Sequence, residues 1–156
     1  MVRSLYLYLL ALSASGIAVP AFSQDTEPLS AGSYRIEGKC SRSFYLGAKR
    51  SPECDHFLGI RVVDPAKPMI IFPLKNEDQA WFFVTSKRET ASSGHAVYSV
   101  EKLYDQALNA EFSYPAGECE MSPGPTVRCT VWKDAKRTVL ARELIFSGSG
   151  NWVHAK

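Results

Sequence analysis

The chain has 156 residues, of which 46% are hydrophobic, and it carries 18 basic against 16 acidic side chains. A chain of this length can bury one proper core and is too short for two ordinary domains. Because the charges nearly balance, the sequence does not predict the basic surface with which proteins follow nucleic acid or anionic lipid. We therefore expect one globular domain without a nucleic-acid partner.

The first 23 residues have the pattern of an export signal. Arg3 gives a positive start, Leu5–Val19 is apolar, and Ala21–Ser23 offers a cleavage site of the small-x-small type. A membrane anchor is the alternative, but the apolar stretch is shorter than about 18–20 residues and is interrupted by polar residues and proline. Cleavage would leave 156 − 23 = 133 residues and no membrane span. We expect a periplasmic or secreted protein.

Residues 24–31 form a polar lead-in, 32–150 an antiparallel β domain and 151–156 a short tail in this interpretation. The densest apolar stretch is Met69–Val84, where Met69–Phe72 and Ala80–Val84 flank a polar turn and so predict a hairpin. Neither run alternates between apolar and polar residues. We therefore expect this hairpin to be covered on both faces, near the middle of the core.

Further β-rich segments surround the hairpin. One of them, residues 96–104, also fits a helical spacing, but we expect a strand because its neighbours are β. The segments 41–55 and 86–95 are expected as loops. The predicted fold is all-β, a single antiparallel barrel or sandwich of about seven to eight strands. The other expected strand segments are Ser33–Cys40, His56–Val63, Glu111–Tyr114, Glu118–Met121, Thr126–Trp132 and Thr138–Phe146.

Four cysteines in an exported chain indicate disulfides, and four allow three pairings. The local solution pairs Cys40 with Cys54 and Cys119 with Cys129. A hairpin centred near Gly124 puts the second pair on facing strands, at about 4.5–5.5 Å between Cα atoms. A zinc site is the alternative, but no C-x-x-C pair is present. We predict two disulfides, with no metal and no cofactor.

No catalytic residue is predicted. The three histidines stand outside known metal-binding motifs, and the sequence lacks a nucleophile turn and a phosphate-binding glycine loop. Among the aromatic residues a filled core is favoured over a cavity for an apolar ligand. Three basic residues between the first two cysteines could hold an anionic ligand, although a solvated loop explains them too: Arg42, Lys49 and Arg50.

Short motifs along the β domain resemble those of small exported alphaproteobacterial proteins without an assigned activity. They include the segments 32–34, 37–40 and 116–119, the two apolar runs of the hairpin, Val127–Cys129 and Phe146–Gly150. The resemblance implies an antiparallel β domain and no particular reaction.

The segment Ala91–Tyr98 is similar to a loop of periplasmic inhibitors of C-type lysozyme, which are small disulfide-bonded β-barrels. In those proteins a Ser/Ala-Ser-Gly-x-x-Tyr loop enters the enzyme's cleft. Here one extra residue precedes the tyrosine, and no basic residue follows Gly94–His95. The resemblance implies contact roles for Ser93 and Tyr98, with His95 beside them.

We predict a non-catalytic binding or interaction module of the cell envelope, whose partner is another envelope or host protein. The segments 41–55 and 86–95 are its expected contact surfaces. Three alternatives stay open: a lysozyme inhibitor, a hydrolase and an apolar-ligand carrier. A hydrolase requires His56 or His95 to meet a carboxylate within about 3 Å, and a carrier requires a dry cavity of about 300 Å³ or more. The sequence makes no prediction of the oligomeric state.

Overall fold

The computed structural model describes residues 29–48, 52–75, 78–90 and 95–155, except for the side chains of residues 87–90. These residues form ten strands and no helix. Eight strands close into an antiparallel barrel in the order β1-β2-β3-β4-β5-β7-β8-β9, because β9 pairs back with β1. The predicted all-β fold is confirmed, and it is a barrel. The strands are β1 (Gly32–Tyr45), β2 (Phe57–Val62), β3 (Met69–Pro73), β4 (Ala80–Thr90), β5 (Ala96–Asp105), β6 (Ala110–Phe112), β7 (Ala116–Ser122), β8 (Thr126–Trp132), β9 (Leu140–Gly148) and β10 (Val153–His154).

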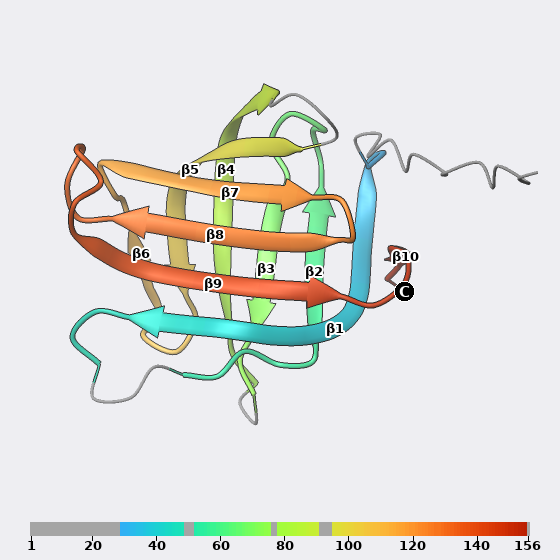
Figure 1. The fold of residues 1–156 in the computed structure, drawn as a ribbon, viewed down its shortest axis with the longest axis horizontal. Coiled ribbons are helices and arrows are strands. Elements are labelled where there is room, and N and C mark those ends of the chain that lie inside the picture. The colour runs from blue at the N-terminus through green and yellow to red at the C-terminus, as the bar shows by residue number, and fades with distance from the viewer. Residues whose placement is uncertain (1–28, 49–51, 76–77, 91–94, 156) are drawn as a thin grey trace, which may run out of the picture.

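The barrel has two walls whose strands cross each other (Figure 1). Strands β7, β8, β9 and the second half of β1 form the front wall, with the first half of β5 beside β7, and β2 to β4 with the rest of β5 lie behind it. Strand β1 belongs to both walls, because Gly32–Glu37 pairs with β2 and Gly38–Tyr45 with β9. At the changeover, a Cβ on Gly38 would lie 2.2 Å from the carbonyl oxygen of Ser147. Only glycine fits this close approach of the two backbones.

Large apolar side chains fill the barrel. In the β3–β4 hairpin, Ile70, Phe72 and Phe83 are fully buried and Trp81 is 1% exposed. This packing agrees with the expected filling of the core by side chains. The other fully buried apolar residues with large side chains are Ile36, Leu58, Ile60, Leu74, Leu103, Leu144 and Phe146.

The expectation that the central hairpin is covered on both faces is wrong. The alternate residues, including Ile71 and Phe82, are only half-buried. The physical reason is barrel closure: each strand has one face toward the interior and the other toward the outside. On the outside these side chains cover one another, as Ile71 does with its cross-strand partner Phe82.

Three other boundaries differ from the sequence prediction. Residues 41–45 continue β1, because a bulge between Cys40 and Arg42 is followed by regular pairing with β9. Residues 86–90 continue β4 through its pairing with β5. The segment Ala96–Asp105 is a strand, which confirms the β interpretation over the helical one. The expected tail contains β10, which pairs with the start of β1.

Both predicted disulfides are present, and all four cysteines take part in them. Cys119 and Cys129 face each other across β7 and β8 with their Cα atoms 4.1 Å apart. The turn between these strands contains Gly124 at φ 86°, in the left-handed region that favours glycine. Disulfides are compatible with an oxidising compartment outside the cytoplasm. Across the described ranges, no helix has the length and apolarity needed to cross a bilayer.

One charged pair lies inside the barrel. Arg142 on β9 is fully buried, and its Nη1 donates to Oδ2 of Asp105 at 2.6 Å. The rings of Tyr45 and Trp81 lie over the guanidinium carbon at 4.0 and 4.6 Å, so cation–π contacts add to the ion pair. Nearby, burial raises the pKa of Tyr114, and the charge of Arg142 opposes that effect. The interior of this end of the barrel is therefore polar as well as aromatic.

Candidate binding groove and adjoining wall

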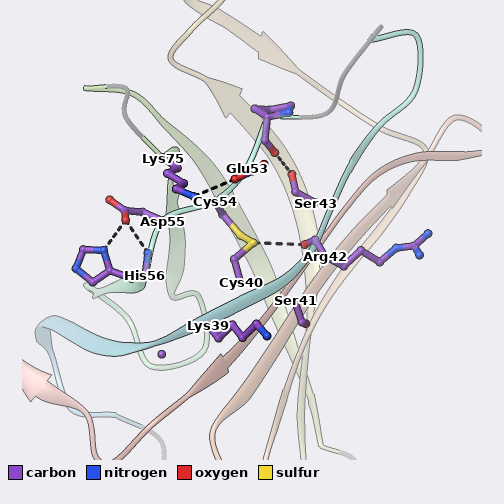
Figure 2. A pocket seen from close by; sticks show the side chains of 12 residues that line it. Lys39, Cys40, Ser41, Arg42, Ser43, Glu53, Cys54, Asp55, His56 and Lys75 are labelled. Atoms are coloured by element: carbon purple, nitrogen blue, oxygen red, sulfur yellow. Dashed lines mark hydrogen bonds and ion pairs between the residues drawn. A yellow bond between two sulfur atoms is a disulfide. The ribbon is translucent and has the colours of Figure 1, made fainter.

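An open groove of about 410 Å³ lies beside the Cys40–Cys54 disulfide (Figure 2). It forms where β1 runs past the end of β2. The segment before β2 follows the β3 side instead, with the amide of Asp55 donating to the carbonyl of Pro73 at 2.8 Å. Two side-chain links hold this seam together: the disulfide, with Cα atoms 5.6 Å apart, and a hydrogen bond from Ser43 Oγ to the carbonyl oxygen of Pro52.

Charged residues line the groove, and most of them are paired with a neighbour. Lys75 Nζ lies 3.2 Å from Glu53 Oε2. His56 Nδ1 lies 2.5 Å from Asp55 Oδ1. The backbone amide of His56 also donates to Asp55, and this bond is the main cause that lowers the pKa of Asp55, against the opposing effect of burial. Figure 2 shows Lys39 and Lys75 on opposite sides of the disulfide.

Lys39 differs from the other cations of the groove. Its side chain is exposed, and among the described residues it has no hydrogen-bond or ion-pair partner. An exposed ammonium without an internal acceptor keeps all three of its donors for water or a ligand. Lys39 is therefore the group in the groove that is most available to an incoming anion.

An ion-pair cluster lies on the outer wall next to the groove. Glu143 on β9 has a side chain only 5% exposed, and it forms ion pairs with two arginines. Arg128 on β8 donates through Nε at 3.0 Å and Nη2 at 2.6 Å to Oε1. Arg42 on β1 approaches Oε2 through Nε. We call Arg42 and Arg128 the outer arginine pair. Glu143 is the carboxylate that both of them contact.

The predicted binding residues fall into three groups. Arg42 lines the groove and belongs to the outer arginine pair. Tyr98 is 4% exposed, so its side chain is buried and not on the surface. His95 is partly exposed at the start of β5. Lys49, Arg50 and Ser93 lie outside the described residues.

Both histidines that the hydrolase alternative needs have a carboxylate neighbour. His56 and Asp55 meet the distance condition, but Asp55 is also the next residue in the chain and binds the histidine's own backbone amide. His95 Nδ1 lies 3.3 Å from Glu120 Oε1 and 3.0 Å from Ser122 Oγ. In a proton relay the hydroxyl and the carboxylate contact opposite ring nitrogens. Here both contact Nδ1, which does not form a relay.

The groove is open and is lined mostly by polar and charged residues, unlike the dry cavity that an apolar-ligand carrier requires. Within the described part of the chain, no three side chains from His, Cys, Asp and Glu gather as they would around a metal ion. The arrangement can therefore recognise charged and hydrogen-bonding groups by contact.

Sequence reasoning missed Lys39, Arg128 and Glu143. For Arg128 a signal existed, because the register that pairs Cys119 with Cys129 also places Glu120 opposite Arg128. Alternation places both on the outer face. Glu143 could not be found in this way, because its partner Arg42 is 101 positions away and beyond a bulge.

Comparison with known proteins finds no match: no family model matches the chain, and neither a curated protein nor a solved structure is significantly similar to it.

Proposed function

We propose that this chain is an exported, non-catalytic binding module of the cell envelope, and that the groove beside Cys40–Cys54 is its contact surface. The observation that carries the proposal is the groove itself. It is open, it is held by a disulfide, and its Lys39 has donors that no described residue uses. A rigid frame with unused donors at its surface favours binding, because little conformational entropy is lost when a partner docks.

The nature of the other charges supports binding over catalysis. Asp55 is engaged with His56 and Glu53 with Lys75, and the hydroxyl of Ser43 donates to a backbone carbonyl. A nucleophile needs a base that accepts its proton, and Ser43 uses its proton in a structural bond. We place the module in the periplasm or outside the cell, where the two disulfides would persist.

Site-specific photocrosslinking in the native cells tests the proposal. A benzophenone amino acid replaces Ser41, which is exposed and lines the groove, and a matched control carries it at Arg61, which is exposed on β2 away from the groove. We expect one dominant crosslinked protein from position 41, and none from position 61. Equal crosslinking at both positions, or none at position 41, would overturn the proposal.

An activity assay tests the second part of the proposal, that the module is non-catalytic. The purified protein is assayed against ester, peptide and glycoside model substrates, together with the variants H56A and S122A. We expect no turnover above that of buffer. Turnover that either substitution abolishes would show that a histidine cluster is catalytic and that binding alone does not describe the function.

A lysozyme inhibitor remains the second candidate, because a small disulfide-bonded barrel is the fold that the resemblance implies. The buried ring of Tyr98 weakens it, since an inhibitory tyrosine would have to reach a partner's cleft. A muramidase assay with micromolar protein decides this candidate. Inhibition that Tyr98→Phe reduces would support it, and unchanged lysis would exclude it.

A further inference from the structure

We propose that the wall beside the groove recognises an acidic protein surface through the outer arginine pair and Lys39. This inference rests on the proposed binding function and names the chemistry of the partner. Front-wall strands β7, β8, β9 and the second half of β1 lie side by side (Figure 1). The register of these strands therefore fixes which outward side chains are neighbours.

The two arginines flank one apolar residue. Arg42 and Arg128 are both register partners of Ile145, one from each side. Their Cα atoms are thus two strand spacings apart, or about 10 Å. Ile145 is half-buried and faces outward, because its neighbours Leu144 and Phe146 are fully buried in the interior.

Glu143 fixes the two guanidinium groups without using all of their donors. The contacts of Arg128 go through Nε and Nη2, and that of Arg42 goes through Nε. Nη1 of Arg128 and both η nitrogens of Arg42 have no other partner in the described chain. Each arginine side chain is about half exposed, at 52% and 51%, so these donors are accessible to a partner.

The local charge favours an anion. Lys39, Arg42 and Arg128 supply three positive charges, and the buried carboxylate of Glu143 compensates one of them. Glu120 lies opposite Arg128 on the side away from Arg42, and its carboxylate compensates a second positive charge, so the balance of these five residues is 3 − 2 = +1. Pre-oriented guanidinium groups bind carboxylates through paired hydrogen bonds and discriminate by geometry as well as charge.

Ile145 favours a protein over a polysaccharide or a phosphate-bearing surface. An apolar side chain between two cations is complementary to carboxylates that stand on either side of an apolar residue. A sulfated glycan or a lipid headgroup has no apolar group at that position. Arginine with an apolar centre is also the composition of energetically important protein contacts.

Nuclear magnetic resonance titration of the folded, oxidised protein tests the inference. The probe is a short peptide that alternates glutamate and leucine, and the control probe replaces each glutamate with glutamine. We expect amide shifts confined to Lys39–Phe44 and to the neighbourhoods of Arg128 and Ile145, with binding that weakens as salt is added. No shifts there, or equal shifts with the glutamine peptide, would overturn the inference.

Charge variants provide the second readout. R42Q/R128Q should weaken glutamate-peptide binding about tenfold or more, given two lost contacts, whereas R35Q/R61Q, with the same change in net charge elsewhere, should leave it unchanged. R42Q/R128Q leaves the buried carboxylate of Glu143 without its two arginine partners, which could disturb the fold. The triple variant R42Q/R128Q/E143Q removes that charge as well. If the triple variant is folded and still binds like the wild type, the inference is wrong.

Two further experiments distinguish an acidic protein from a sulfated glycan or an anionic lipid, and the charge inference from the binding function. Heparin and phosphatidylglycerol vesicles are titrated under the same conditions, and either one shifting the wall residues more strongly than the peptide would overturn the assignment to an acidic protein. Crosslinking from position 41 tests the binding function without reference to charge. A crosslinked partner that R42Q/R128Q/E143Q still captures equally would leave the binding module standing and remove only this inference.

Discussion

Arg142 and Glu143 are consecutive residues of β9, both are nearly fully buried, and they point to opposite sides of the barrel wall. Inside, Arg142 meets one carboxylate, Asp105, so the pair is neutral and is enclosed by aromatic rings. Outside, Glu143 meets two arginines, so the cluster has an excess positive charge at the surface.

The contrast separates an ion pair that stabilises the fold from a cluster that can bind a partner. In the interior, desolvation of both charges is compensated only if each keeps its partner. Arg142 Nε and Nη2 have no hydrogen-bond acceptor in the described structure, so this pair depends on a single bond to Asp105 and on the rings. On the wall, water can satisfy every spare donor, and a partner can later replace that water. The predictions below test this difference.

The largest effect is expected inside the barrel. Asp105→Ala should lower the free energy of unfolding by about 3–5 kcal/mol, because it leaves the charge of Arg142 buried and unpaired. Arg142→Met should also destabilise strongly, whereas the double variant D105L/R142M should cost much less than the sum of the single changes. Urea unfolding with the disulfides intact measures all three. Additive costs would show that the pair is not coupled.

The wall cluster should be less costly to break. Glu143→Gln keeps an oxygen acceptor and removes a charge, so we expect a loss of about 1–2 kcal/mol. Arg42→Ala and Arg128→Ala should each cost less than about 1 kcal/mol, because half-exposed ion pairs contribute little. High salt should reduce these differences and leave that of Asp105→Ala unchanged. If E143Q is as destabilising as D105A, the distinction between the two sides of β9 fails.

How far the sequence predicts these two regions depends on the range of the interactions. The β3–β4 hairpin, the Cys119–Cys129 bond and the Gly124 turn were predictable, because each is settled by residues close together in the chain. Barrel closure by β9 onto β1 was not, since a sandwich would satisfy the same alternation.

The candidate site was predictable only in part. The sequence indicates Arg42 as one of a group of basic residues, although it predicts a loop for the segment that contains Arg42. Its strand geometry comes from the bulge after Cys40, and bulges leave little trace in a single sequence. Arg142 also escaped notice, because an arginine within a strand is normally solvated, and only the fold brings Asp105 to it.

The smallest effect concerns a carboxylate in the turn between β8 and β9 that forms no ion pair with any residue the structure describes. Backbone amides of Thr138 and Val139 donate to Asp134, and these bonds hold the pKa of Asp134 below its usual value of 3.8. A lowered folded-state pKa gives stability that is present above the unfolded pKa and is lost as the pH falls through the folded one. Asp134→Ala should therefore be less stable than the wild type at neutral pH.

The difference from the wild type should shrink as the pH falls below about 4, where the unfolded carboxyl begins to bind a proton. Urea midpoints at pH 7 and pH 3 measure it, with Asp64→Ala, in another exposed turn, as the matched control. Because the amides bind an ionised carboxylate and release a neutral one, a difference that stayed constant with pH would mean that the turn needs only the shape of Asp134. The charge of that carboxylate would then contribute nothing, in contrast to the carboxylates of Asp105 and Glu143.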